Sequence, residues 1–279
     1  MSLLLQTQEL CRQHGIIPAR SKGQNFLIEE NVYEAVVDAA NLIKDDLVLE
    51  VGPGFGFLTA RLAKRVKKVI AVELDSNLAN FLKNFFVSQK IANVELIEAD
   101  VLKLALNSSG LAKYKIVSNL PYNISSIFLR KFLTAEHKPE SLTLLLQKEV
   151  AERIVAKPGE MSLLALSVQF YAEPKIVQIV PAKAFWPAPK IDSALISIII
   201  KSEAPKVSEK SFFRLAKFGF SAKRKKLKNN LAGGLSIDAV LAGEYLTQIG
   251  LSADVRAEDL SLEHWLDLYQ LLSAKKILG

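Results

Sequence analysis

Cysteine and histidine are scarce in this chain of 279 residues. Cys11 is the only cysteine, so no disulfide can form within the chain. The three histidines, His14, His137 and His264, are too far apart in sequence to form a familiar metal-ligand spacing. We therefore expect a cytoplasmic protein that holds no metal.

Long apolar runs are also missing. No run approaches the roughly 20 apolar residues that a membrane-spanning helix requires. The opening MSLLLQTQELCRQHG has only three consecutive leucines before its polar residues, so we expect no secretory signal and no membrane partner. Hydrophobic residues nevertheless make up 50% of the chain, which is ample for a packed core. The length allows one large domain and a smaller second one.

Positive charge is concentrated in one short region. The whole chain has 36 basic and 29 acidic residues, which gives a net charge of +7. Residues 206–228 contain nine Lys or Arg and a single acid, Glu209, whereas residues 229–279 contain three basic and seven acidic residues. Such a local excess suits a surface that meets phosphate groups. A solvated helix face, or a nuclear-import segment at SAKRKKLK, would have the same composition.

The most informative stretch is LVLEVGPGFGFLT, at 47–59. Its first five residues predict a buried strand that is apolar except for Glu50. Gly52, Gly54 and Gly56 follow, and an amphipathic stretch, FLTARLAKRV, begins directly after them. A strand that turns through glycines into a helix brings backbone N–H groups and the positive end of the helix close to a ligand. We expect this ligand to be a cofactor that carries a nucleoside.

The spacing of these glycines distinguishes two classes of cofactor. A dinucleotide fold requires G-x-G-x-x-G, and Phe57 stands where its last glycine belongs. A nicotinamide dehydrogenase is therefore disfavoured. The G-x-G-x-G spacing, with Glu50 two residues ahead, resembles motif I of S-adenosylmethionine-dependent methyltransferases. A glycine turn that only closes a strand–helix unit would have the same spacing, so other residues must decide.

Two acidic residues end the next two predicted strands. KKVIAVELD predicts a strand ending near Glu73, 21 residues after Gly52, and VELIEAD predicts one ending at Asp100. Open parallel sheets bind ligands at the carboxyl ends of their strands. There, Glu73 can accept hydrogen bonds from ribose hydroxyls, and Asp100 can accept one from the adenine amino group of a cofactor. Either acid alone could be a helix cap or a surface residue, but together with Gly52 they indicate a nucleoside site.

A fourth predicted strand, YKIVSNL, leads directly into Asn119, Leu120, Pro121 and Tyr122. Amino-group methyltransferases place Asn or Asp, any residue, Pro and an aromatic here. An adenine amino group is a poor nucleophile because its lone pair is delocalised into the ring. Acceptors against its two hydrogens, the Asn119 side-chain oxygen and the Leu120 carbonyl, favour a pyramidal nitrogen aimed at the methyl carbon. Pro121 fixes the turn, and Tyr122 offers a face to an unstacked base. An ordinary strand-end turn is the alternative.

Two further stretches complete the expected organisation. AFWPAPKID holds Phe185 and Trp186 in a proline-rich loop that either presents an aromatic at the mouth of a pocket or crosses over the core. KSEAPK, at 201–206, marks the best domain boundary, because the pattern beyond it is purely helical.

Together these stretches resemble one family, the KsgA-type ribosomal RNA adenine dimethyltransferases. Each segment alone is a weak indication, but the ordered set covers nearly the whole chain and is specific. The matching segments are GQNFL (23–27), LEVGPGFGFLT (49–59), VELD (72–75), EAD (98–100), NLPYNISS (119–126), LQKEVAERI (146–154), FWPAPKIDSA (185–194), KRKKLKNNL (223–231) and RAEDLSLEHW (256–265).

The resemblance implies an α/β fold. A Rossmann-like, doubly wound, seven-stranded methyltransferase domain at 1–203 would bind S-adenosylmethionine, and a small all-α C-terminal domain at 204–279 would contact RNA. The implied cofactor ligands, from the methionine end to the adenine, are Asn25, Leu27, Asn119, Gly52, Gly54, Glu73 and Asp100. Asn119, Leu120, Pro121 and Tyr122 would form the catalytic motif, and Phe185 would stack on the target adenine opposite Tyr122. The basic run supplies the expected RNA contacts: Lys223, Arg224, Lys225, Lys226 and Lys228.

Enzymes of this family methylate two adjacent adenosines near the 3′ end of small-subunit (16S) ribosomal RNA, twice each. We therefore expect a monomeric enzyme that acts on this RNA in a maturing 30S particle and is linked to small-subunit biogenesis. A resistance-type enzyme acting on large-subunit ribosomal RNA and a non-catalytic RNA-binding assembly factor are the alternatives. The leucine of NLPY, KRKKLKNNL and RAEDLSLEHW favour the small subunit, and the intact catalytic motif argues against loss of activity. A cytosine-ring methyltransferase would need a cysteine nucleophile, and Cys11 lies in no such context.

Overall fold

The protein is described by a computed structural model that covers residues 1–18, 23–104 and 113–278. The chain forms two compact units, Met1–Ala151 with Glu173–Ile200, and Glu152–Ala172 with Lys201–Gly279. The division after Ile200 lies close to the expected boundary at 203. Residues 152–172, which we placed in the first domain, belong to the second unit. The functions assigned to the two domains stay predictions.

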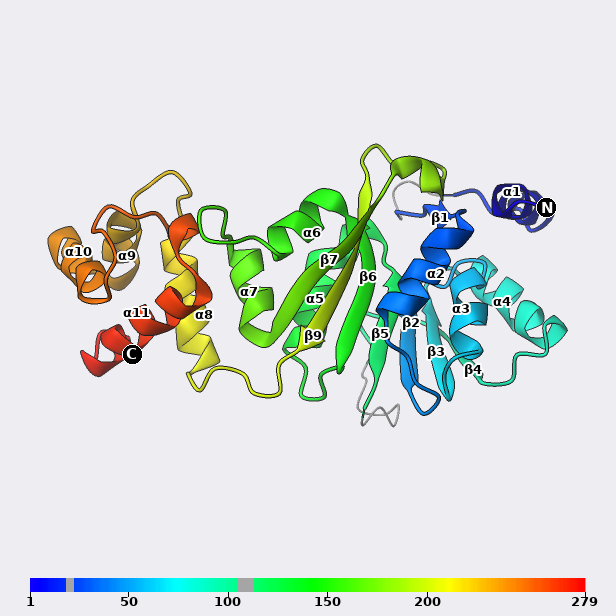
Figure 1. The fold of residues 1–279 in the computed structure, drawn as a ribbon, viewed down its shortest axis with the longest axis horizontal. Helices are drawn as coiled ribbons and strands as arrows, with labels where there is room; N and C mark the ends of the chain where they lie inside the picture. Colours follow the sequence, from blue (N-terminus) through cyan, green and yellow to red (C-terminus); the bar gives the residue numbers. More distant parts are fainter. Residues whose placement is uncertain (19–22, 105–112, 279) are drawn as a thin grey trace. The chain divides into compact units, whose positions relative to one another are not determined.

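A seven-stranded sheet forms the centre of the first unit (Figure 1). Its strand order is β4-β3-β2-β5-β6-β9-β7. The first five strands of this order pair in parallel, and β9 runs antiparallel to β6. This confirms the predicted seven-stranded α/β sheet. The strands are β2 (Leu47–Val51), β3 (Lys68–Glu73), β4 (Val94–Glu98), β5 (Lys115–Asn119), β6 (Ser141–Gln147), β7 (Ala172–Val180) and β9 (Ser193–Ile200).

The central strands are apolar on both faces, as parallel strands covered by helices must be. Val48 and Val69 are register partners in β2 and β3, and both are fully buried. Strand β2 also buries one charged residue, Glu50, which is 1% exposed. Burying an acidic side chain costs free energy, so a role for Glu50 is sought in the site.

The order of the strands creates a switch point between β2 and β5. From β2 the chain proceeds outward to β3 and β4, then returns to add β5 and β6 on the other side of β2. At such a point the connections that leave the carboxyl ends of the two neighbouring strands run in opposite directions, which opens a crevice above the sheet. Gly52 follows β2 and Asn119 ends β5, so both lie at this crevice.

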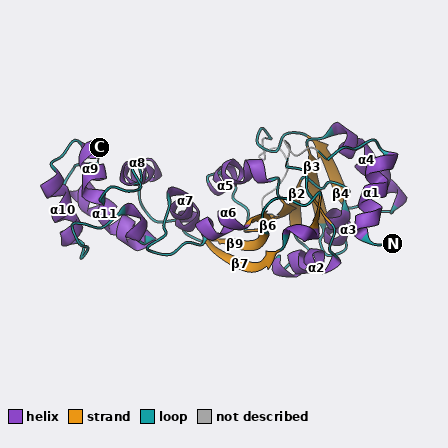
Figure 2. Ribbon diagram, turned by 90° about the horizontal axis from the view of Figure 1, so that it is seen from above, coloured by secondary structure: helices purple, strands orange, loops and turns teal. Residues whose placement is uncertain are grey.

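Helices cover both faces of the sheet. Helices α2 (Glu30–Ala39) and α3 (Phe57–Ala63) lie on one side, and α5 (Ser125–Leu133) lies on the other (Figure 2). Helix α4 (Ser76–Ser88) packs against β3 and β4, and α1 (Leu3–Gln13) packs against α4 through a shared apolar cluster. In the described part of the chain no helix is long and apolar enough to cross a membrane.

A two-stranded antiparallel ribbon lies apart from the main sheet. It pairs β1 (Phe26–Leu27) with β8 (Phe185–Trp186), in the register Phe26 to Trp186 and Leu27 to Phe185. The sequence predicted neither strand, because two residues are too few to show a period. The hydroxyl of Tyr33 in α2 fixes this ribbon further, since it donates to the carbonyl of Leu27 at 2.9 Å.

The second unit is built from helices joined by loops. Its longer helices are α7 (Leu163–Tyr171), α8 (Glu209–Gly219), α9 (Leu227–Leu235), α10 (Ala239–Gln248) and α11 (Leu262–Ala274). Helix α7 joins the others through an aromatic cluster in which Phe170 packs on Phe212. Trp265 of α11 fills the space beside Gly219 so closely that a Cβ there would lie 2.2 Å from its ring. The all-α nature predicted for the C-terminal part is thus observed.

Candidate active site

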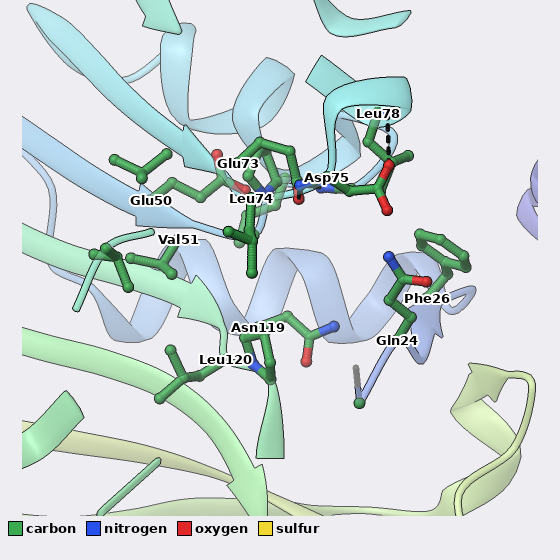
Figure 3. A pocket seen from close by; sticks show the side chains of 18 of the residues that line it. Gln24, Phe26, Glu50, Val51, Glu73, Leu74, Asp75, Leu78, Asn119 and Leu120 are labelled. Atoms are coloured by element: carbon green, nitrogen blue, oxygen red, sulfur yellow. Dashed lines mark hydrogen bonds between the residues drawn. The ribbon is translucent and has the colours of Figure 1, made fainter. Parts of the chain in front are cut away.

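A pocket of about 220 Å³ lies at the carboxyl ends of the central strands. Its walls come from the segment before β1, the glycine turn after β2, the ends of β3 and β5, and the turn after β4. Figure 3 shows Glu50 and Glu73 on one side of this pocket, Asn119 on another, and Gln24 with Phe26 at its margin. The structure brings these predicted site residues together: Asn25, Leu27, Gly52, Gly54, Glu73, Asp100, Asn119, Leu120, Pro121 and Tyr122.

The glycine turn forms the floor of the pocket. Gly52 and Gly54 both have positive φ, 65° and 59°, a conformation that side chains with a Cβ rarely adopt. A Cβ on Gly54 would also lie 3.2 Å from the ring of Phe26, which lines the same pocket. The turn therefore needs glycine for its backbone conformation and for the space above it.

Glu73 ties the end of β3 to the glycine turn. Its Oε2 accepts from the N–H of Gly54 at 3.3 Å, and its Oε1 accepts from the N–H of Asp75 at 2.9 Å. Burial raises the pKa of this carboxyl, and the two backbone hydrogen bonds oppose the rise. Each oxygen keeps a lone pair for a further donor, so Glu73 can accept from the hydroxyls of a bound ribose.

Glu50 is the buried charge of the site. It lines the pocket from β2, and its Oε2 has no hydrogen-bond partner among the described residues. Burial raises the pKa of Glu50 to about 8; the nearby Thr59 hydroxyl opposes the rise, and the negative charge of Glu73 adds to it. Glu50 precedes the glycines of the motif, but no role of its own was predicted for it from the sequence. A buried acceptor without a partner suits a ligand that carries positive charge.

Asp100 lies on the turn that follows β4. Its Oδ1 accepts from the N–H of Leu102 at 2.9 Å, and its carbonyl accepts from the N–H of Lys103 at 2.9 Å. Lys131 of α5 donates to the carbonyls of Leu102 and Leu104 at 2.9 and 2.6 Å. The sequence did not single out Lys131, although it holds the turn that carries Asp100.

Asn119 has a defined orientation. Its Nδ2 donates to the carbonyl of Asn25 at 3.2 Å, which leaves Oδ1 as an acceptor. Asn25 itself lines the pocket and donates from its own amide to the carbonyl of Gly23 at 3.3 Å. The segment before β1 therefore orients the residue that ends β5. An acceptor on a fixed amide at a pocket edge is what the predicted role of Asn119 requires.

Tyr122 opens a short 3₁₀ turn, Tyr122–Ile124, directly after Pro121. It is half-buried and lines the pocket. Its hydroxyl lies 2.6 Å from Oγ of Ser193, the first residue of β9. No role was predicted for Ser193 from the sequence, although it lies within the segment FWPAPKIDSA.

Comparison with known proteins agrees with this geometry. A family model described as ribosomal RNA adenine dimethylase matches residues 19–274. The chain belongs to this family. Ribosomal RNA small subunit methyltransferase A of Dehalococcoides mccartyi strain CBDB1 is 44% identical over 268 residues, which cover 95% of this chain and 91% of that protein. The enzyme of the same name from Alkaliphilus oremlandii is 38% identical and covers 93% of both chains.

Two solved structures share the fold of this dimethylase. A dimethyladenosine transferase from Plasmodium falciparum superposes with a TM-score of 0.79 at 25% identity, over 90% of this chain and 98% of that one. The 23S rRNA methyltransferase ErmE superposes with a TM-score of 0.74, also at 25% identity, over 89% of this chain and 100% of that one. The chain is therefore an S-adenosylmethionine-dependent enzyme of the Rossmann-like methyltransferase class.

The pocket of this dimethylase fits S-adenosylmethionine. The positive-φ glycines leave room above the turn, Glu73 can accept from ribose, and the unpartnered oxygen of Glu50 suits the positive charges of the cofactor. The pocket therefore offers acceptors both for the ribose hydroxyls and for the positive charges of the cofactor. Each individual ligand assignment stays a prediction.

Phe185 is not at the pocket. Its side chain is 2% exposed and packs in the core with Leu27 and Val180. Neither Phe185 nor Trp186 belongs to the described residues that line the pocket. In the ribbon Phe185 pairs with Leu27, and both residues are 2% exposed. The expected stacking of Phe185 on the target adenine stays a prediction.

The basic run lies at the start of α9, in the second unit. Lys223, Arg224, Lys225 and Lys226 are exposed and Lys228 is half-buried. Lys226 and Lys228 both form ion pairs with Asp254, at 2.8 and 2.9 Å, and together they lower the pKa of Asp254 to about 2. For Lys223, Arg224 and Lys225 no ion pair is found with any described residue. The five predicted RNA contacts therefore fall into two groups.

Proposed function

We propose that this dimethylase transfers methyl groups to the 6-amino groups of two adjacent adenosines near the 3′ end of small-subunit ribosomal RNA, two to each. Relatives that are 44% and 38% identical over more than nine-tenths of the chain carry the name of a small-subunit methyltransferase. The observation that carries the chemistry is Asn119, whose amide is fixed by Asn25 with Oδ1 open at the pocket edge.

We expect the residues that would hold the cofactor to follow its length from the methionine end to the adenine. Asn25 and Leu27 would contact its methionine end, where Glu50 is also available. Gly52 and Gly54 would lie beneath it. Glu73 would hold the ribose, and Asp100 would accept from the adenine amino group. When bound, S-adenosylmethionine supplies an electrophilic methyl group on a positively charged sulfur.

The chain's own residues prepare the target amino group. Oδ1 of Asn119 and the carbonyl of Leu120 accept its two hydrogens, which draws the nitrogen toward a pyramidal shape and frees its lone pair for the methyl carbon. Pro121 fixes the turn so that both acceptors face the same point. Tyr122 stacks on a base that has left its helix. The contribution is mainly orientation, which can supply a large share of a rate enhancement.

A second candidate function has a specific observation in its favour. The structure named 23S rRNA methyltransferase ErmE shares the fold at a TM-score of 0.74. Its identity of 25% is well below the 44% of the small-subunit enzyme, so we favour the small subunit. The two candidates differ in which ribosomal RNA becomes methylated.

The proposal extends to the setting of the reaction. We infer that the substrate is RNA in a maturing 30S particle, that the enzyme acts as a monomer in the cytoplasm, and that the second unit contacts RNA through its basic run. The excess of nine basic residues over one acid at 206–228 supports the last point.

The test separates cofactor binding from transfer. Asn119→Ala should bind S-adenosylmethionine within about threefold of the wild type, while methyl transfer to RNA falls by at least about a hundredfold, because its acceptor acts in the transition state. Affinity is measured by calorimetric titration and transfer by label in RNA. Glu73→Ala is the matched variant, and it should weaken cofactor binding about tenfold or more. Parallel loss of both properties in Asn119→Ala would reduce Asn119 to a cofactor ligand.

A further inference from the structure

The hydroxyl of Tyr122 is held by a residue from a distant part of the chain. Ser193 lies 71 positions further along and its Oγ is 2.6 Å from the tyrosine oxygen. Ser193 is fully buried, whereas Tyr122 is half-buried and lines the pocket. One partner thus belongs to the interior and the other to the site.

The serine stands on a rigid base. Strands β6 and β9 pair in register from Ser141 with Ile199 to Gln147 with Ser193. The turn into β9 is fixed as well, because the carbonyl of Asp192 accepts from the N–H of Lys148 at 3.0 Å. Its Oδ1 accepts from the N–H of Ala182 at 2.9 Å. The position of the Ser193 hydroxyl is therefore set by the sheet.

The same sheet carries Asn119. β6 pairs with β5, and Asn119 is the register partner of Leu145 in β6. The bond between Tyr122 and Ser193 therefore ties the aromatic ring to the strands that hold the acceptor for the target amino group. A ring held only by its own two torsions could turn, and the base stacked on it would move away from Asn119. Displacements of about 1 Å in such an arrangement cost much of the rate.

We propose that Ser193 is a positioning residue for methyl transfer: its hydroxyl fixes the ring of Tyr122 so that a stacked adenine presents its amino group to Asn119 and Leu120. This inference rests on the proposed function. Ser193 touches neither cofactor nor base, and it acts only through Tyr122. Tyr122 lines the pocket and lies three residues after Asn119 in the chain.

The test is a cycle of three variants, Ser193→Ala, Tyr122→Phe and the two combined. Each single change removes the same hydrogen bond, and Tyr122→Phe keeps the stacking ring and the buried serine. We expect each to lower kcat on unmethylated small-subunit particles about three- to tenfold. The double variant should be no slower than either single one. The KM for RNA and the affinity for S-adenosylmethionine should change less than about twofold, because other groups bind both.

Ser197→Ala is the matched control, since Ser197 lies on the same strand four residues on and pairs with Thr143; its kcat should equal that of the wild type. Additive losses in the double variant would overturn the inference, as would a Ser193→Ala enzyme with unchanged kcat or with only a lower Tm. The inference would also be overturned if Ser193→Ala were slower than the wild type while Tyr122→Phe kept full activity. A wild type that methylates no adenosine would overturn the proposed function and this inference together, which separates the two failures.

Discussion

At the scale of single residues, Glu50 combines an ionisable side chain with deep burial. A carboxyl that is 1% exposed and lacks a partner for one oxygen would be expensive to ionise, and its pKa of about 8 expresses that cost. Burial therefore favours the protonated form of Glu50. A cationic ligand reverses this preference, because it favours the ionised form.

The pH dependence of stability follows from the raised pKa. The pKa of Glu50 is 4.5 in the unfolded chain and about 8 in the folded protein, so between these pH values Glu50 carries a proton only in the folded protein. The contribution of Glu50 to the free energy of unfolding is thus complete below pH 4.5 and is lost as the pH rises through 8. Glu50→Gln should flatten this decline, by up to about 4 kcal/mol between pH 5 and 9.

Urea unfolding of the apo protein at pH 5, 7 and 9 measures this effect. Glu136→Gln, an exposed acid in the same unit, is the control and should follow the wild type at every pH. If wild type and Glu50→Gln decline in parallel, Glu50 is ionised in the apo protein and its environment has been misjudged.

Asn119 illustrates a different dependence between residues. The orientation of its amide is set by the carbonyl of Asn25, which lies 94 positions earlier in the chain. Variants that disturb the turn at Gly23–Asn25 should therefore lower transfer even where they leave the catalytic motif intact.

Among the structural elements, α5 links the catalytic motif to the turn after β4. Lys131 reaches from this helix to the carbonyls of Leu102 and Leu104. Burial lowers the pKa of Lys131, and the nearby charge of Asp100 opposes the shift. The lysine thus holds the segment on which the predicted adenine ligand sits.

Lys131→Met should weaken binding of S-adenosylmethionine about three- to tenfold, because the turn that carries Asp100 loses its two anchors. Calorimetric titration measures the affinity. Arg130→Met is the matched control, since Arg130 is the exposed neighbour on the same helix, and its affinity should equal that of the wild type. Equal affinities in both variants would show that the turn keeps its shape without Lys131.

The loop before α9 gives a second prediction at this scale. Asp254 engages Lys226 and Lys228, so these two lysines must leave it to meet phosphate. Asp254→Asn should therefore strengthen RNA binding and steepen the slope of log affinity against log salt, by about 0.7 to 0.9 for each further phosphate that a freed lysine neutralises. Lys223, Arg224 and Lys225 changed together to Ala should weaken binding and flatten the slope.

RNA affinity at several salt concentrations checks both variants. The control changes Lys64, Arg65 and Lys67 to Ala, which removes equal charge at the amino-terminal edge of β3, away from the pocket. Cofactor affinity should be the same in all of them. If the control flattens the salt dependence as much as the basic run does, the effect is one of net charge and the RNA track lies elsewhere.

At the scale of the whole molecule, the sequence predicted the sheet and most of the pocket for a physical reason. Glycines, strand-end acids and the motif at Asn119 are local features, and the parallel sheet gathers them at one edge. The features that the sequence did not show depend on long-range pairing. The ribbon of β1 and β8 joins segments that lie about 160 residues apart, and no local pattern shows this.

The partners supplied from far away were missed for the same reason. Ser193, Lys131 and the carbonyl of Asn25 act through contacts with residues that are distant in the chain. Glu50 could have been found, because it is the one acid in an apolar strand and buried acids require a reason. The place of Glu152–Ala172 in the helical unit depends on packing with α8 and α11, which only the fold reveals.

The most direct measurement maps the methylated bases. Ribosomal particles from a strain that lacks this modification are incubated with the enzyme and labelled S-adenosylmethionine, and the RNA is digested and sequenced. The proposed function predicts dimethyladenosine at two adjacent positions near the 3′ end of the small-subunit RNA, and none with Asn119→Ala. Label in large-subunit RNA, label on another base, or undiminished transfer by Asn119→Ala would contradict it.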